Sequence, residues 1–367
     1  MKTTVLLLAA VLAAAAFSGC DSILLSRPPG TEPASHASSD PKMTGIWLLG
    51  GVSAAAISTT VSEVDLYDQA ANVWYPAVTS LPTPVSFAGY GAYDGKLYVI
   101  GGFNAAGVAQ TAVQIYNVAS NTWSSGSTLP LARANIFAAQ KGDRFLVLGG
   151  TAAAASAGFS GSVTTYDYNA PGNSWTAKVN YGATNLYDRA ALAFDDAIYN
   201  FGGRSAVATM VTTHDAVLYS PNVLSTGVTE VVLSAARTQM ASVLYRPTSS
   251  VSYMLLIGGA SALTLGVNGI PAATGGTVLN TVQYLAYPFA APSAWTAGTN
   301  FPVPIACASA LVLGDRAYVF GGVSSMPPTG TSQVYSSALA NPASLAWTTH
   351  ANMPRQRYGH GAVTLNQ

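Results

Sequence analysis

Short apolar segments that end in two glycines recur along the chain. They cover residues 46–51, 97–102, 145–150, 198–203, 254–259 and 317–322. Successive double glycines lie 51, 48, 53, 56 and 63 residues apart, which indicates an internal repeat. Each apolar segment has the length of one buried strand. The glycines after it let the backbone turn sharply, or approach a neighbour where a side chain would clash.

Further features complete each repeat. A short strand with a tyrosine follows each double glycine, and these tyrosines are Tyr67, Tyr116, Tyr166, Tyr219, Tyr284 and Tyr335. A tryptophan follows in five of the six units, namely Trp74, Trp123, Trp175, Trp295 and Trp347, whereas the fourth unit has Val231 and Val232 near this place. Another strand-like segment, such as 88–93 or 190–194, and a polar turn precede the next double glycine. Each unit therefore predicts four short strands.

Double glycine, tyrosine and tryptophan at this spacing resemble the kelch repeat over roughly residues 44–367. The resemblance implies an all-β fold, a six-bladed β-propeller of four-stranded kelch blades. The aromatic residues would fill the wedge between adjacent sheets. The chain enters at Ile46, which matches a second strand, and residues 360–365 match a first strand. We therefore expect the C-terminal strand to pair into the N-terminal blade and close the ring, which removes open sheet edges.

The N-terminus has the pattern of an export signal. Lys2 precedes an apolar run over 5–17, and small residues then lead to Cys20. Residues 17–20 also resemble the lipobox of bacterial lipoproteins, which implies that Cys20 is lipidated; the alternative is an ordinary signal peptide in which Cys20 is incidental. We expect a signal peptide at 1–19, a flexible tether at 20–43 and the propeller at 44–367. The protein would be exported and lipid-anchored in the bacterial cell envelope, on the periplasmic side or at the cell surface.

Composition restricts the partners. Lys plus Arg and Asp plus Glu each number 15, only 8% of residues are charged, and half are hydrophobic. No basic field is available to attract nucleic acid or an anionic membrane surface. We expect a monomer that contacts the membrane only through its lipid anchor.

Catalytic signatures are missing from the sequence. It has no P-loop, dinucleotide fingerprint, HExxH or Gly-x-Ser-x-Gly motif, and its four histidines, His36, His214, His350 and His360, are not spaced as metal ligands. We predict no cofactor and no metal. Cys307 lies in an apolar stretch and is interpreted as a small buried residue.

Two enzymes with kelch propellers provide a comparison. Galactose oxidase needs copper, two histidines and a Tyr–Cys cross-link, and the sequence offers no matching set. Periplasmic sialic-acid mutarotase is a six-bladed kelch propeller, and its ring-opening chemistry needs a general acid or base. We can align no glutamate of this chain to a channel-facing position.

Arginine recurs just before the predicted innermost strand. Four units carry it, as Arg133, Arg189, Arg237 and Arg357, while the other two have Val85 and Ile305 there. In kelch proteins this segment lies at the mouth of the central channel. Converging guanidinium groups would bind an anion or a carboxylate. The alternative is structural, with each arginine bonded to neighbouring carbonyl groups.

The sequence therefore favours a non-catalytic binding module at the cell envelope, which recognises a glycan, a peptide or a protein partner. The alternative is a carbohydrate-active enzyme resembling periplasmic sialic-acid mutarotase. His360, in the last predicted inner strand, is interpreted as a hydrogen-bonded packing residue rather than a catalyst. The long loop at 260–280 is either a binding loop or a neutral insertion.

Overall fold

The structure is a computed structural model of the whole chain. It describes residues 40–54, 57–152, 164–178, 188–195, 197–204, 214–220, 223–229, 233–262, 277–287, 294–325 and 328–365. The expected signal peptide (1–19) and most of the expected tether, including Cys20, lie outside these residues, as do Val231 and Val232 and most of the 260–280 loop. Helix α1 (Pro41–Thr44) begins inside the expected tether and packs on β2 (Glu63–Asp68).

The described strands form six four-stranded antiparallel sheets and one two-stranded sheet. Sheet 1 contains β26 (Gly361–Thr364), β1 (Ile46–Leu49), β2 and β3 (Val73–Ser80). Sheet 2 contains β4 (Gly89–Tyr93), β5 (Lys96–Ile100), β6 (Val113–Asn117) and β7 (Thr122–Ser125). Sheet 3 contains β8 (Phe137–Lys141), β9 (Arg144–Leu148), β10 (Thr165–Asn169) and β11 (Ser174–Lys178).

Sheet 4 contains β12 (Ala190–Phe194), β13 (Ala197–Phe201), β14 (His214–Ser220) and β15 (Val223–Thr229). Sheet 5 contains β16 (Ala241–Tyr245), β17 (Ser252–Ile257), β20 (Val282–Tyr287) and β21 (Thr296–Ala297). Sheet 6 contains β22 (Ser309–Leu313), β23 (Arg316–Phe320), β24 (Val334–Ala338) and β25 (Thr348–Thr349). The small sheet pairs β18 (Ala260–Ala262) with β19 (Thr277–Val278).

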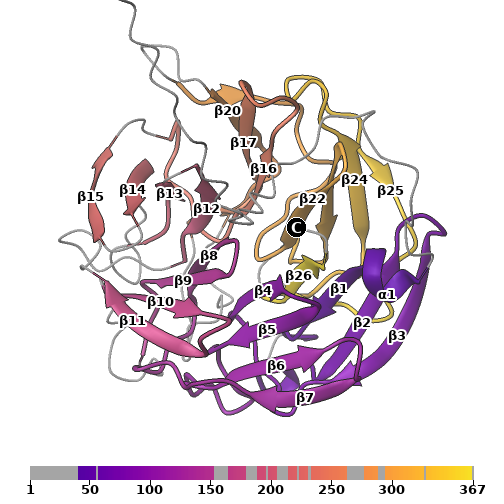
Figure 1. Cartoon of the computed structure of the whole chain (residues 1–367). Coiled ribbons are helices and arrows are strands. Elements are labelled where there is room, and N and C mark those ends of the chain that lie inside the picture. The colour runs from indigo at the N-terminus through magenta and orange to yellow at the C-terminus, as the bar shows by residue number, and fades with distance from the viewer. Residues whose placement is uncertain are drawn as a thin grey trace, which may run out of the picture.

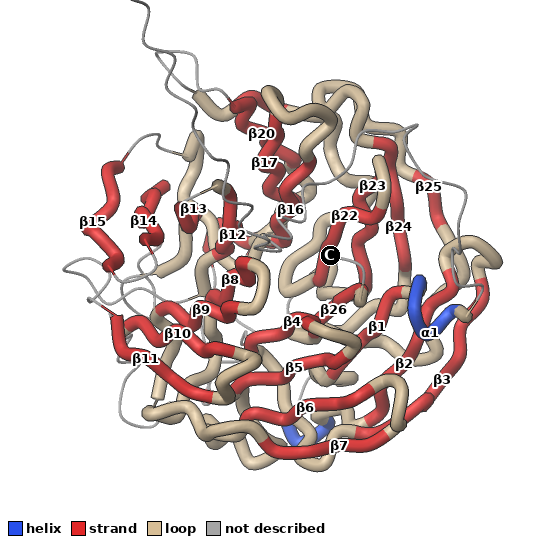
Figure 2. The backbone as a smooth tube through the Cα atoms, viewed as in Figure 1, coloured by secondary structure: helices blue, strands red, loops and turns tan. Residues whose placement is uncertain are grey.

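The sheets stand around a common centre, as in a β-propeller (Figure 1). The first strand of each sheet lies innermost and contacts the first strands of both neighbouring sheets, in the ring order β26, β4, β8, β12, β16 and β22. Strands make up nearly all of the regular structure (Figure 2). The fold is therefore an all-β propeller of four-stranded blades, as the repeats predict.

The C-terminal strand closes the ring. In β26, Gly361 pairs with Leu49 and Thr364 pairs with Ile46, so the last strand is the innermost strand of the sheet that the first strand begins. Strand β26 lies near the middle of the ring, beside β1 (Figure 1). The predicted pairing of the two ends is confirmed.

The double glycines are explained by contacts between sheets. In five sheets, a Cβ on the first glycine would come under 3.0 Å from a carbonyl oxygen of the next sheet, for the pairs Gly50–Val85, Gly101–Arg133, Gly202–Arg237, Gly258–Ile305 and Gly321–Arg357. The N–H of the second glycine donates to the same carbonyl at 2.7–3.0 Å. Both residues of each double glycine have positive φ. Only glycine combines this backbone with so close an approach.

The aromatic residues join adjacent sheets, as predicted. Trp123 in sheet 2 donates from Nε1 to Thr79 in sheet 1 at 2.9 Å, and Trp175 in sheet 3 donates to the Ser127 carbonyl, which follows sheet 2, at 2.8 Å. The ring of Trp175 packs on Tyr168 with a centroid distance of 4.9 Å, and the Tyr168 hydroxyl donates to Asn173. Tyr67 and Tyr116 make the same contacts in their own sheets. The tyrosine of the third repeat is therefore Tyr168, two residues beyond the predicted Tyr166.

Candidate functional site

A belt of backbone hydrogen bonds surrounds the axis. One residue stands two positions before each innermost strand, and we call these six residues the axial belt: Phe87, Asn135, Asp188, Gln239, Cys307 and Gly359. All six have φ between 49° and 59°. The N–H of Phe87 donates to the Gly359 carbonyl, Gly359 to Cys307, Cys307 to Gln239 and Gln239 to Asp188, at 2.7–3.3 Å. The left-handed region costs an L-residue roughly 1–2 kcal/mol, and such residues cluster at functional sites. The belt is therefore the first place to look for a site.

A cavity of about 140 Å3 lies beside this belt. The residue after each belt position lines it, which gives one residue from every sheet: Ala88, Ile136, Arg189, Met240, Ala308 and His360. Belt residues, among them Phe87, Gln239 and Cys307, line it as well. We call this space the axial cavity. It occupies the end of the ring where the innermost strands begin and the second strands end, because Gly361 pairs with Leu49 there.

Three of the four predicted arginines lie outside the lining of the axial cavity. Arg133, Arg237 and Arg357 stand four residues before their innermost strands and are 4%, 2% and 0% exposed. Arg237 donates to the Gly258 carbonyl at 3.3 Å, and Arg357 donates to the Gly50 carbonyl at 2.9 Å. Arg133 donates to the Thr164 hydroxyl at 2.7 Å. These three guanidinium groups bond to groups within the protein, as the structural alternative describes, and ligand binding by the four arginines at the channel mouth stays a prediction.

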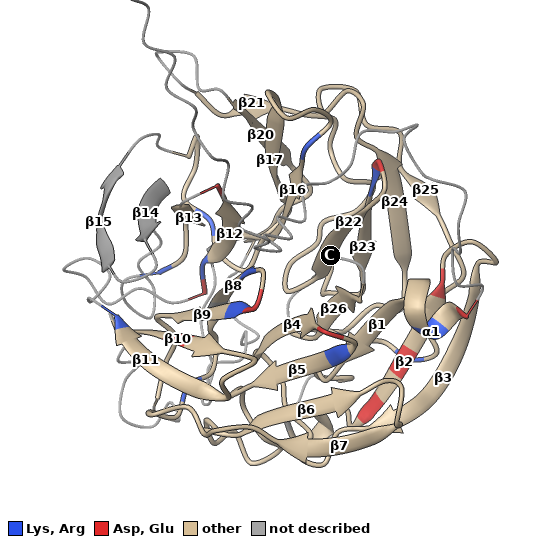
Figure 3. Cartoon of the chain, in the orientation of Figure 1, with Lys and Arg blue, Asp and Glu red and all other residues tan. Residues whose placement is uncertain are grey.

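Arg357 also belongs to a buried ion pair. Its Nη2 bonds to Asp65, and both side chains are fully buried. Asp65 further accepts from the N–H of Ala77 at 2.8 Å, and Arg355 lies 3.3 Å from it. Charged residues are sparse on the ribbon, and β2 carries several of them (Figure 3). This group holds β2, β3 and the segment before β26 together.

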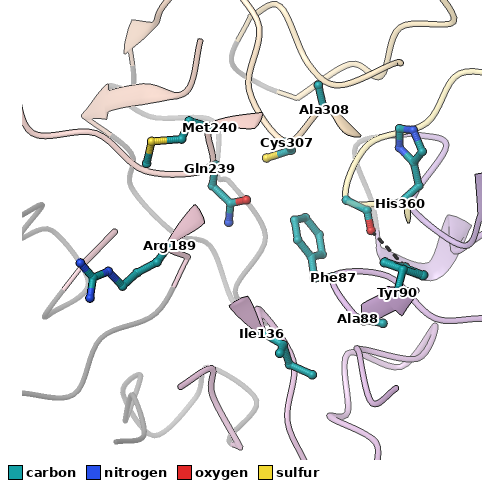
Figure 4. Close-up of a pocket in the computed structure, with 11 residues that line it drawn as sticks. Phe87, Ala88, Tyr90, Ile136, Arg189, Gln239, Met240, Cys307, Ala308 and His360 are labelled. Atoms are coloured by element: carbon teal, nitrogen blue, oxygen red, sulfur yellow. Dashed lines mark hydrogen bonds between the residues drawn. The ribbon is translucent and has the colours of Figure 1, made fainter. Parts of the chain in front are cut away.

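Arg189 differs from the other three because it directly precedes β12. This offset of three residues puts it at a lining position of the axial cavity, equivalent to His360 and Met240. Its Nη2 donates to the Asn200 carbonyl of β13 at 3.1 Å. Its guanidinium group lies at the end of the side chain that points away from Gln239 and Phe87 (Figure 4). The side chain thus contributes to the cavity wall, while Nη2 is engaged with β13.

A buried ion pair that the sequence analysis missed lies next to the belt. Arg204 pairs with the belt residue Asp188, and both side chains are fully buried. Arg204 follows the fourth double glycine, where the other repeats have Val52, Phe103, Thr151, Ala260 and Val323. One charged residue in a column of uncharged ones was the available signal. An aspartate at such a position is also typical of an ordinary turn, so Asp188 gave no comparable signal.

The polar groups of the axial cavity are uncharged near neutral pH, apart from Arg189. Burial, with Arg357 nearby, lowers the pKa of His360 to about 3. Burial raises the pKa of Cys307 to about 12, with Arg204 opposing it. Cys307 is a buried free cysteine, as predicted. His360 is 6% exposed, and neither ring nitrogen has a hydrogen-bond partner among the described residues, so the expected hydrogen-bonded packing role is not observed.

Within the described residues, no group of three or more His, Cys, Asp or Glu side chains could hold a metal ion. The same residues contain no helix with the length and apolarity needed to cross a membrane.

Comparisons with known proteins agree with this geometry. Residues 84–130, which include sheet 2 and its double glycine, match the family model of the kelch motif. Among solved structures, the chain is similar to the one titled "Structure of YjhT", with a TM-score of 0.62 and 13% sequence identity over 82% of this chain and 96% of that chain. No curated protein matches the sequence. The chain therefore carries a kelch motif on a β-propeller fold.

Proposed function

We propose that this protein is a six-bladed kelch propeller that acts as a non-catalytic binding module, anchored at the cell envelope. Each of the six four-stranded sheets would be one blade. The axial cavity, lined from every sheet, would hold a terminal group of a glycan, a peptide or a protein partner. The observation that carries the proposal is this cavity, which joins apolar walls to a few polar groups, as ligand sites do.

The size of the cavity limits what enters it. Its volume of about 140 Å3 resembles the roughly 150 Å3 engineered cavity that accepts benzene. It is well below the roughly 300–1,000 Å3 of pockets for drug-sized ligands. One ring-sized group would therefore enter, and the rest of the partner would lie on the loops around the mouth.

A cavity-filling variant tests the proposal. Ala308→Phe places a ring in the axial cavity, whereas Leu131→Phe alters an exposed side chain outside its lining. Wild type and both variants would be screened against immobilised glycans and peptides, with melting temperatures measured alongside. Ligands retained by wild type and L131F but lost by a folded A308F support the cavity as the site. An unchanged ligand profile for A308F would exclude it.

The enzymatic alternative, resembling sialic-acid mutarotase, needs a general acid or base at the cavity. His360 is the lining residue that favours it. With a pKa of about 3, however, its imidazole is a weak base near pH 7, where efficient bases titrate close to the working pH. We therefore rank binding first. Sugar anomers should interconvert at the same rate with and without the protein in a time course followed by NMR, and a His360-dependent acceleration would reverse the ranking.

Anchoring through Cys20 is a separate part of the proposal. Its support is the signal pattern that ends in Ser18, Gly19 and Cys20. Wild-type protein expressed in bacteria should enter the detergent phase after phase separation, and Cys20→Ser should move it to the aqueous phase. Equal partitioning of the two proteins would mean that Cys20 carries no lipid.

A further inference from the structure

Two residues that line the axial cavity carry buried polar atoms without a partner among the described residues. Nε2 of Gln239 and both ring nitrogens of His360 make no hydrogen bond to any described residue. Both residues line the cavity, and they come from different sheets. A buried polar group without a partner costs about 1–3 kcal/mol, so a ligand that satisfies these atoms gains affinity.

From these contacts we infer that the axial cavity selects a neutral, hydroxyl-bearing group, such as the edge of an uncharged sugar ring, over an acidic one. The inference rests on the proposed binding function and specifies its ligand. It reverses the preference that the four arginines suggested.

Hydrogen-bond chemistry favours a hydroxyl. The amide Nε2 of Gln239 can only donate, whereas a neutral imidazole has one donor and one acceptor nitrogen. A hydroxyl both donates and accepts, so it can match Nε2 of Gln239 and either the donor or the acceptor nitrogen of His360. A carboxylate only accepts, and the acceptor nitrogen of His360 would stay unmatched.

Charge points the same way. Burying a carboxylate without a cationic partner is costly. Arg189, the arginine in the cavity lining, directs Nη2 to the Asn200 carbonyl, and its side chain runs away from Gln239 and Phe87 (Figure 4). Cys307 and His360 are uncharged near neutral pH. A neutral ligand loses far less solvation energy on entry.

The walls of the cavity suit the carbon face of such a ring. In Figure 4 the Phe87 ring, the Gln239 amide and the Cys307 sulfur face one another across the middle of the cavity. Met240 and Ile136 supply further apolar surface. Apolar walls with few polar groups fix the orientation of a ligand that has both kinds of surface.

Matched sugars test the inference. Glucose and galactose would be compared with glucuronate and galacturonate, which differ by one carboxylate, using ligand-observed NMR titration. Each neutral sugar should bind about tenfold or more tightly than its acidic counterpart. Gln239→Leu and His360→Phe should each weaken binding of the neutral sugar by about tenfold, the equivalent of about 1.4 kcal/mol.

Gln110→Leu is the control, because Gln110 lies in a loop of the same face and its amide is bonded to the Val108 carbonyl at 2.8 Å. It should leave affinity unchanged, and melting temperatures would identify any unfolded variant. Tighter binding of the acidic sugars would overturn the neutral preference while the cavity stays a binding site. No binding of any of the four sugars would overturn this ligand class, and the A308F screen would then decide separately whether the cavity binds a partner.

Discussion

At the scale of single residues, backbone geometry at the double glycines determines how neighbouring sheets meet. Five first glycines approach a carbonyl of the next sheet, and the second glycines bond to that carbonyl. The sequence could predict this requirement because glycine has a known conformational advantage at a close contact. It could single out Arg204 as a charged residue where the other repeats are uncharged, but not its partner, because Asp188 also fits an ordinary turn.

Two glycines with the same backbone angle separate strain from contact. Gly258 has φ +64° and a Cβ there would overlap the Ile305 carbonyl oxygen, while Gly314 has φ +62° and nothing within 4 Å. Gly314→Ala should lower the free energy of unfolding by about 1–2 kcal/mol, from backbone strain alone. Gly258→Ala should lower it by clearly more, or prevent folding. Urea denaturation measures both, and equal losses would contradict the role of the sheet contact.

His360 should make stability depend on pH. Its native pKa of about 3 lies below the value of about 6.5 expected in the unfolded chain. As the pH falls, His360 is therefore protonated in the unfolded state before it is protonated in the native state. Its contribution to the free energy of unfolding is fully present above pH 6.5. It is lost as the pH falls towards 3, by up to about 1.4 kcal/mol per pH unit. The free energy of unfolding, measured by urea denaturation between pH 4 and 7, should change less with pH for His360→Phe than for wild type. Identical slopes would contradict the prediction.

At the scale of elements, strand order and pairing could be predicted because each repeat marks its strand ends with a double glycine and a polar turn. The positions of the arginines could not all be predicted. Whether an arginine before an innermost strand lines the cavity depends on how many residues separate it from the start of that strand. Arg133, Arg237 and Arg357 lie four residues before their strands, but Arg189 lies one residue before β12. The same limit applies to Tyr166 and Tyr168, which share β10 and differ only in register.

The closing strand should be essential. Deleting residues 357–367 removes β26, exposes the edge of β1 and leaves Asp65 without Arg357. The truncated protein should aggregate or melt at a much lower temperature. Removing residues 366–367 alone is the control, because they lie beyond β26. A melting curve unchanged by the longer deletion would refute the closure.

At the scale of the whole molecule, the sheets depend on one another. Carbonyl bonds from the double glycines, tryptophan bonds and the axial belt all run between sheets. An open array of repeats can lose its units one after another, whereas a closed ring has no free end at which to begin.

Unfolding should therefore be a single cooperative transition, despite the repeated sequence. Tryptophan fluorescence reports on several sheets, and far-UV circular dichroism reports on all strands. In urea the two signals should have coincident midpoints. Two separate midpoints would show that groups of sheets unfold independently.

The axial belt is held together by main-chain hydrogen bonds, so its side chains can be varied. Phe87, Gln239, Cys307 and Gly359 share one backbone geometry although their side chains have little in common. The scaffold thus tolerates different chemical groups at the axis while the same N–H and carbonyl groups hold it together. A library randomised at Phe87, Gln239 and Cys307 would change the side chains beside the axial cavity without redesigning the ring.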